Sequence, residues 1–158
     1  MVRVPLGGPV PPLLPSMRRG TTFAELAAVL AILAIVTAIT LPRLTQVRDW
    51  IAVNAAAQDV TTSIAVARYA AVMQGVRSRA VIAADSLRID RWQGDSWGPM
   101  LRWGGPLQHG VTLVASNPVI MFDPIGLGRG LSNTTIELQR GDRVETITVS
   151  RVGRVKRW

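Results

Sequence analysis

The apolar segment from Phe23 to Leu41 constrains the fold of this chain more than any other feature. It contains one charged residue, Glu25, and is otherwise apolar apart from Thr37 and Thr40. As an α-helix it would be about 28 Å long at ~1.5 Å per residue, close to the ~30 Å hydrocarbon core of a bilayer. The sequence therefore predicts a membrane-spanning helix near the N-terminus.

Glu25 is unusual at the start of such a helix. A carboxylate near the centre of a membrane segment costs roughly 2.5 to 3.5 kcal/mol on insertion scales, and less near an end. No Lys, Arg or His lies between Thr21 and Pro42 to neutralise it. If the chain were cut between Gly20 and Thr21, the new α-amino group would lie about one helical turn from Glu25. A neighbouring copy could offer the same amine, so we expect cleavage to create the missing cation.

The residues Arg18-Arg19-Gly20, with Glu25 five positions further on, resemble the processing site of the type IV pilin and pseudopilin superfamily. In that family a prepilin peptidase cuts a basic leader after its terminal glycine, and the glutamate pairs with the N-terminus of an adjacent subunit. The resemblance implies cleavage between Gly20 and Thr21, N-methylation of Thr21 and an assembly role for Glu25. The family usually has phenylalanine or methionine as its first mature residue, whereas this chain has Thr21.

Two other interpretations of the segment remain open. The first is an ordinary signal anchor in which Glu25 is incidental. The second is a cleaved secretory signal. The apolar run is longer than the roughly 7 to 15 residues usual for such a signal, and it ends at Leu41-Pro42 without a clear small-x-small cleavage site.

The residues before Met17 are rich in proline and predict no folded structure. Met17 begins the sequence Met-Arg-Arg-Gly, a compact leader of the kind that the resembling family uses. This favours Met17 over Met1 as the start of translation.

Beyond the apolar segment the helix is expected to continue to Gln74, with Gly75 as its C-terminal cap. Pro42 is expected to kink it, because proline removes a backbone donor and clashes with the preceding turn. Apolar residues recur at spacings of three and four and predict an amphipathic helix that supports a head. These residues are Leu44, Val47, Ile51, Val60, Ile64, Ala67 and Ala71.

After Gly75 the pattern becomes that of β-strands, with short β-branched or aromatic runs separated by Gly, Asp, Asn and Pro. Gly141-Asp142 is a hairpin signal between the last two runs. The runs are Ser78 to Ala84, Leu87 to Trp92, Val111 to Ala115, Val119 to Phe122, Thr134 to Gln139 and Val144 to Ser150.

The expected fold class is therefore α+β: a long N-terminal membrane-spanning spine helix packed on a mostly antiparallel β-sheet head, as in pilins. The expected organisation is a leader at 1–20, a transmembrane part at 21–42, an amphipathic part at 43–75 and a head at 76–158. The sequence has no cysteine, so disulfides and thiolate metal sites are excluded.

The C-terminal half indicates a subfamily. Phe122 to Gly126, Thr135 to Leu138, Ile147 to Ser150 and Gly153 to Arg157 resemble the minor pseudopilins called GspH and their FimT-like relatives. The resemblance implies a structural subunit of the periplasmic pseudopilus of a type II secretion system, with no cofactor, no small-molecule substrate and no enzymatic activity. Its implied partners are other pilin or pseudopilin subunits, the prepilin peptidase and inner-membrane lipid, with the head in the periplasm.

A basic C-terminus supports an alternative function. The chain has a formal net charge of +8, and cations beside an aromatic residue can contact phosphates while the ring stacks on a base. FimT-like pilins carry a DNA-binding glycine-arginine motif near the C-terminus, which would make DNA a partner during natural transformation. A solvated edge strand whose cations discourage aggregation or dock on another subunit is the other interpretation. The candidate residues are Arg151, Arg154, Lys156, Arg157 and Trp158.

A third hypothesis, a membrane-anchored periplasmic enzyme, finds no motif to support it. His109 lies in a Gly/Pro-rich stretch without a Gly-x-Ser-x-Gly elbow and is expected in a loop. Gly126 to Gly130 lacks a following helix signal, so we expect a flexible connection rather than a phosphate loop. The aspartates at 85, 90, 95 and 123 do not have calcium-loop spacing. No metal site is predicted.

Three tryptophans lie close together in the sequence, Trp92, Trp97 and Trp103. Core packing or loop anchoring is the commoner role for such residues, and a ligand platform is the rarer one.

Overall fold

The computed structural model describes residues 22–129 and 133–158. The chain divides into two units, one ending at Ile39 and the other running from Thr40 to Trp158. The leader and cleavage site that the sequence predicts, including Gly20 and Thr21, lie outside the described residues. The packing described below concerns the second unit.

Helix α1 runs from Phe23 to Gln74, the bounds that the sequence predicted. Thr22 caps its start, since the Glu25 backbone N–H donates to Thr22 Oγ1 at 3.3 Å. Gly75 follows its end with φ +64°, a left-handed conformation that glycine adopts without a Cβ penalty. Position 42 lies inside the helix, and the kink expected at Pro42 stays a prediction.

The N-terminal part of α1 is long and apolar enough to cross a membrane. None of its most apolar window is buried in the described structure. An exposed apolar helix of this length is typical of a segment whose natural surroundings are lipid or other apolar helices.

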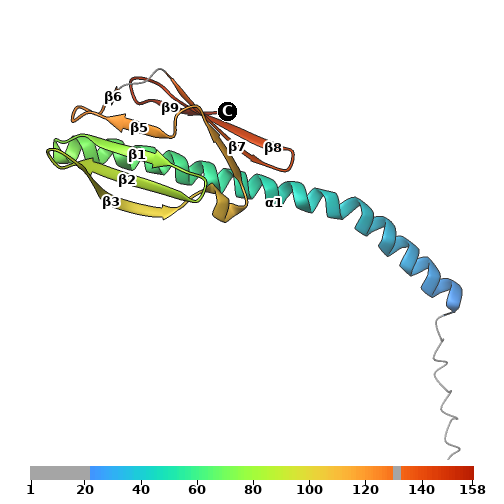
Figure 1. The fold of residues 1–158 in the computed structure, drawn as a ribbon. Helices are drawn as coiled ribbons and strands as arrows, with labels where there is room; N and C mark the ends of the chain where they lie inside the picture. The colour runs from blue at the N-terminus through green and yellow to red at the C-terminus, as the bar shows by residue number, and fades with distance from the viewer. Residues whose placement is uncertain (1–21, 130–132) are drawn as a thin grey trace, which may run out of the picture. The chain divides into compact units, whose positions relative to one another are not determined.

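The head contains two antiparallel sheets (Figure 1). The five-stranded sheet has the order β3-β2-β1-β5-β6, and the four-stranded sheet has the order β4-β7-β8-β9. The first comprises β1 (Ser78–Ile82), β2 (Ser86–Trp92), β3 (Trp97–Gly104), β5 (Val119–Phe122) and β6 (Gly128–Arg129). The second comprises β4 (Thr112–Ala115), β7 (Thr134–Arg140), β8 (Arg143–Val149) and β9 (Val155–Arg157), and a short 3-10 helix, η1 (Pro106–His109), precedes β4.

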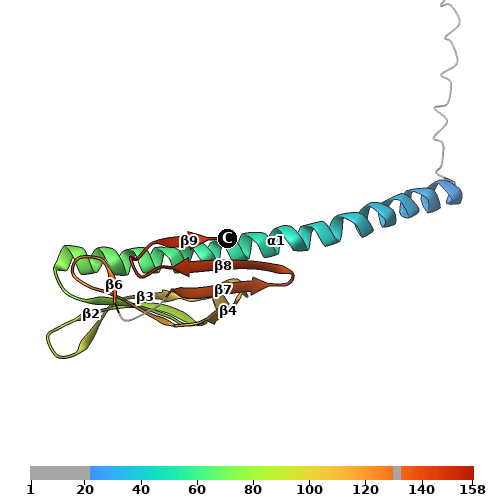
Figure 2. The same ribbon diagram turned by 90° about the horizontal axis from the view of Figure 1, so that it is seen from above.

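The core lies between the C-terminal half of α1 and the two sheets. Figure 2 shows the strands lying beside this half of the helix. Small residues such as Ala56, Ala57 and Ala67 are fully buried on the helix and let the sheets approach closely. Bulky side chains from the strands fill the space opposite, and each contributes roughly 1.5 to 3 kcal/mol by its burial. The largest of these are Phe122, Ile82, Leu87, Ile89, Ile136, Leu138 and Ile147.

The predicted amphipathic stripe on α1 is correct at its C-terminal end and wrong at its N-terminal end. Val60 and Ile64 are buried, but Leu44, Val47 and Ile51 are 50%, 53% and 54% exposed. The buried part of the helix starts at Ala52. Residues of the second unit that precede Ala52 therefore present apolar side chains that no strand covers.

Two further expectations need correction. Trp97 to Gly104 was not predicted as a strand, yet it forms β3 and pairs with β2. Part of the segment expected as a flexible connection, Gly128–Arg129, forms the short strand β6 and pairs with β5. Gly130 lies outside the described residues. Glycine and proline in these segments hide the alternation that would reveal a strand.

Candidate functional site

Glu25 is exposed in the first turn of α1. No cationic side chain pairs with it in the part of the chain that the structure describes. The sequence Thr22-x-x-Glu25 is a helix-start signature that places a carboxylate near the positive end of the helix dipole. Sequence reasoning overlooked Thr22, although this spacing could have identified it.

The basic C-terminus forms the edge strand β9, which pairs with β8 through Val149↔Val155 and Ile147↔Arg157. The edge strand, which was one of the two interpretations of these residues, is present at the end of the four-stranded sheet, and the role of its cations stays a prediction. Its five candidate residues do not form one uniform basic surface, because their side chains have different partners.

Arg157 is engaged within the molecule. Its Nε donates to Glu145 Oε1 at 2.5 Å, its Nη2 to Asn54 Oδ1 at 2.6 Å and its Nη1 to Gln58 Oε1 at 3.3 Å. Glu145 is largely buried, with 11% of its side chain exposed. Arg157 thus joins β9 and β8 to helix α1, and binding a phosphate would require it to give up these contacts.

Lys156 and Trp158 are paired with each other. The Lys156 ammonium lies 3.4 Å from the Trp158 ring centroid, which is a cation–π contact. Trp158 Nε1 also donates to Thr148 Oγ1 at 3.2 Å. The indole remains 68% exposed, so the opposite ring face can still contact another molecule.

Arg151 and Arg154 are the available cations of this region. Both are exposed in or beside the turn between β8 and β9, and neither has a carboxylate partner among the described residues. The turn itself is fixed: the Ser150 hydroxyl accepts the Arg154 backbone N–H at 3.1 Å, and Gly153 has φ +74°.

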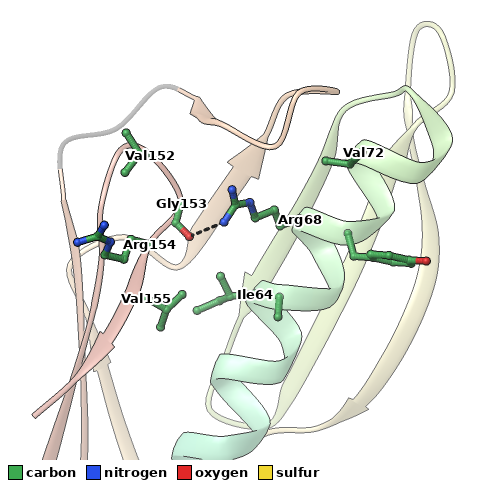
Figure 3. A pocket seen from close by; sticks show the side chains of 9 residues that line it. Ile64, Arg68, Val72, Val152, Gly153, Arg154 and Val155 are labelled. Atoms are coloured by element: carbon green, nitrogen blue, oxygen red, sulfur yellow. Dashed lines mark hydrogen bonds between the residues drawn. The ribbon is translucent and has the colours of Figure 1, made fainter.

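A groove of about 740 Å³ lies between this turn and helix α1 (Figure 3). Arg68 crosses it and donates to the Gly153 carbonyl at 3.4 Å, a long hydrogen bond. The volume of the groove falls in the ~300 to 1,000 Å³ range of ligand sites. The lining residues are Ile64, Ala65, Arg68, Tyr69, Val72, Val152, Gly153, Arg154 and Val155.

The groove combines apolar walls with two guanidinium groups, those of Arg68 and Arg154, that have no carboxylate partner in the described parts of the chain. Such a surface favours an anionic or carboxylate-bearing group with an apolar neighbour. Sequence reasoning missed Arg68 and Tyr69. The spacing of Ile64, Arg68 and Val72 places them on one helix face and was the available signal.

His109 was expected in a loop, but it lies in the 3-10 helix η1. Its Nε2 is 2.9 Å from Asp59 Oδ2. Gln108 donates to the same carboxylate oxygen at 3.2 Å. The pair fastens η1 to α1. No group of three or more potential metal ligands occurs among the described residues.

Three of the four scattered aspartates form ion pairs. Asp90 has a nearly buried side chain, 3% exposed, between Arg79 Nε at 2.8 Å and Arg88 Nε at 2.9 Å. The Arg79 contact is an aligned hydrogen bond, whereas Arg88 Nε lacks hydrogen-bond alignment. Asp85 and Asp123 pair with Arg102 and Arg129 at 3.8 and 3.3 Å.

Trp92 and Trp97 contact each other edge to face at 5.2 Å between centroids. Arg77 lies 5.6 Å from the Trp92 ring, and Arg79 lies 4.5 Å from the Trp97 ring. Trp103 packs against the core. These contacts agree with the packing role that the sequence favoured, because each ring has intramolecular neighbours.

Comparison with known proteins gives three findings. The family described as "Type II transport protein GspH" matches residues 56–153. No curated protein matches the sequence. Two solved structures with similar folds are a type IV minor pilin and a minor pseudopilin.

The type IV minor pilin FimU of Pseudomonas aeruginosa is 18% identical, with a TM-score of 0.56 over 66% of this chain and 86% of that one. The minor pseudopilin EpsH from the type 2 secretion system of Vibrio cholerae is 14% identical, with a TM-score of 0.55 over 67% of this chain and 95% of that one. At these identities the likeness concerns the fold. The family match covers more than half of the chain, so the protein belongs to the GspH family and has the fold of minor pilins and pseudopilins.

Proposed function

We propose that this protein is a minor pseudopilin, a structural subunit of the periplasmic pseudopilus of a type II secretion system. The observation that carries the proposal is the GspH match over residues 56–153, in a chain whose helix α1 begins with an exposed apolar segment. The apolar part of α1 anchors the subunit in the inner membrane, with the head in the periplasm. Residues 21–42 then form the membrane part, 43–75 the amphipathic part and 76–158 the head.

Assembly follows from processing in this proposal. The prepilin peptidase removes residues 1–20, Thr21 is N-methylated, and Glu25 pairs with the new N-terminus of a neighbouring pilin or pseudopilin subunit. The exposed Glu25, which lacks a cationic partner among the described residues, supports this pairing. An ion pair across a helix interface would offset the cost of a carboxylate in lipid.

Substitutions at the two sites test the processing and assembly steps separately. Gly20→Val should leave the leader attached, which an immunoblot detects as a larger chain. Glu25→Ala should be processed normally but recovered less in sheared filaments, because the interface carboxylate is missing. Leu26→Ala, a neighbouring change without charge, is the matched control. Normal recovery of Glu25→Ala in filaments would refute the pairing mechanism.

Deletion of the gene distinguishes a secretion apparatus from a pilus. Loss of exoprotein release, with motility and DNA uptake retained, is the expected result. Restoration by the wild-type gene but not by Gly20→Val would tie the phenotype to the processed subunit. Loss of motility or DNA uptake alone would assign the protein to a type IV pilus.

DNA binding by a FimT-like minor pilin is the second candidate. The exposed Arg151 and Arg154, which have no carboxylate partner in the described regions, favour it. In a gel shift with duplex DNA at two salt concentrations, Arg151→Gln with Arg154→Gln should weaken binding and lower the salt slope by about 2, at ~0.9 per phosphate contact. Arg91→Gln is the exposed control. If the double variant binds DNA with the same affinity and salt slope as the wild type, this tail is excluded as the DNA site.

A further inference from the structure

The apolar residues of α1 that lie before the buried part of the helix form a surface with three arginines. We call this surface the collar. Trp50 is 51% exposed, and Leu44 and Val47 are 50% and 53% exposed. The collar comprises Arg43, Leu44, Val47, Arg48 and Trp50 of α1 with Arg143 at the start of β8.

The hairpin between β7 and β8 holds Arg143 beside the helix. Arg140 Nε donates to Asp49 Oδ1 at 2.9 Å, which fixes the tip of the hairpin on α1. Gly141 allows the close approach, since a Cβ there would lie 2.6 Å from Asp49 Oδ2. The tip of the hairpin is therefore tied to the helix next to Trp50.

Two hollows meet at Trp50. One, of about 480 Å³, is lined by Thr45, Gln46, Asp49, Trp50, Gly141, Asp142 and Arg143. The other, of about 360 Å³, is lined by Arg43, Gln46, Val47 and Trp50. Together they make a recessed surface around one indole ring, with arginines at its edges.

The charge of the collar is positive. Arg43, Arg48 and Arg143 have no carboxylate partner among residues 22–129 and 133–158. Asp49 is engaged by Arg140, which leaves Asp142 as the acid that faces the larger hollow. The two hollows are lined by two such cations, Arg43 and Arg143, against one free carboxylate, and Arg48 adds a third positive charge on the same stretch of helix. This balance favours an anionic ligand.

The position of the collar along the helix identifies the ligand. Trp50 follows Leu41, the last residue of the apolar segment, by about 13 Å along the helix axis at ~1.5 Å per residue. Helix side chains point back toward the N-terminus, so Trp50 and Arg48 extend toward the apolar segment. Tryptophan is enriched at the level of lipid headgroups, and arginine binds phosphate through paired N–H donors.

We propose that the collar binds the headgroups of anionic phospholipids in the leaflet where α1 leaves the membrane. The bound lipid holds the hairpin between β7 and β8 at the membrane surface until the subunit enters a filament. This inference rests on the proposed membrane anchoring, because the collar adjoins the segment that would cross the bilayer. Leu44 and Val47 contact the acyl boundary, Trp50 lies at the headgroups, and the arginines bind phosphate.

The absence of cysteine makes the hairpin easy to label at one position. The full chain with Asp142→Cys, carrying a fluorophore, is reconstituted at one copy per nanodisc with a trace of headgroup-spin-labelled lipid that quenches nearby fluorophores. Quenching is compared between phosphatidylcholine alone and phosphatidylcholine mixed with phosphatidylglycerol. The mixture should quench the label more strongly. Each arginine of the collar changed to Gln should lower the docked-to-undocked ratio about five-fold.

Two controls make the result specific. The first is a label at Asp95→Cys, in the turn between β2 and β3, which should respond to neither lipid. The second is the charge-matched triple variant at Arg91, Arg151 and Arg154, each changed to Gln, which should leave the quenching at position 142 unchanged. Equal quenching in both lipids, or an equal loss in this triple variant, would overturn the collar as a headgroup site.

Two further measurements separate the possible failures. If alkaline carbonate extracts the wild-type chain from membranes, the anchor itself is wrong and the proposed function fails with it. If the chain resists extraction and position 142 still ignores lipid charge, the collar proposal alone fails. Quenching that changes with the number of copies per nanodisc and not with lipid charge would identify a second copy of the chain as the occupant.

Discussion

Individual side chains decide what the basic C-terminus can do. The cations that follow one another in the sequence have three different environments in the structure. Arg157 binds Glu145 and contacts α1, and Lys156 makes a cation–π contact with Trp158. Arg151 and Arg154 are exposed to solvent. The sequence showed the cluster and offered an edge strand as one of its two interpretations. The sequence could not predict that these cations have different partners, because Asn54 and Glu145 are distant from Arg157 in the sequence and contact it only in the folded protein.

Replacing Arg157 should lower the free energy of unfolding more than replacing Lys156. Arg157→Ala removes the ion-pair partner of the largely buried Glu145, and an unsatisfied charged group of this kind costs roughly 1 to 3 kcal/mol, reduced here by partial exposure. Lys156→Ala should change the free energy of unfolding by about 0.5 kcal/mol or less. Urea denaturation in detergent measures both. Equal effects of the two substitutions would show that the Arg157 contacts add nothing to stability.

At the level of helices and strands, the fully buried alanines of α1 determine how closely the sheets approach the helix. We call these alanines, Ala56, Ala57, Ala67 and Ala71, the seam. Ala57 and Ala67 are fully buried, and the Ala67 carbonyl accepts a hydrogen bond from the Ser78 hydroxyl of β1. Alanine also has the highest helix propensity. The same residues therefore favour the helix and fit it to the strands. The end of α1 at Gln74 could be predicted from the sequence because Gly75 follows it as a C-terminal cap.

Enlarging a seam residue should destabilise the head. Ala57→Leu would overpack the core and is expected to lower the free energy of unfolding by about 1 to 3 kcal/mol. Ala65→Leu, on an exposed position of the same helix, should change it by about 0.5 kcal/mol or less. Thermal denaturation followed by circular dichroism compares the two variants. A similar loss in both would mean that helix propensity, not packing, explains the result.

The elements that the sequence did not predict share a physical cause. β3 contains Gly98 and Pro99, residues depleted from strands, and proline is tolerated there because β3 is an edge strand. β9 was expected only as one of two interpretations of the C-terminus, because it is three residues long and is held by its pairing with β8. The hairpin with Gly141-Asp142 was predicted because its turn chemistry is local. Pairing partners distant in sequence have no such local signal.

At the scale of the whole molecule, each of the two units has its own apolar surface. In the N-terminal unit the apolar residues of α1 are exposed, with Leu30, Ile35 and Val36 each more than half accessible. In the second unit, exposed apolar side chains include Trp50 at the collar and Tyr69 at the groove beside β9. Lipid and neighbouring helices are the proposed surroundings of the first surface, and anionic headgroups are the proposed ligands of the collar.

Mass spectrometry of the N-terminus tests whether this protein is a processed subunit of a filament. Filaments sheared from cells, or recovered after overproduction of the major subunit, are digested and searched for the first peptide of this chain. We expect a peptide that begins at N-methylated Thr21, present at far lower amounts than the major subunit. Filaments without this chain, or with a chain that still carries residues before Thr21, would contradict the account.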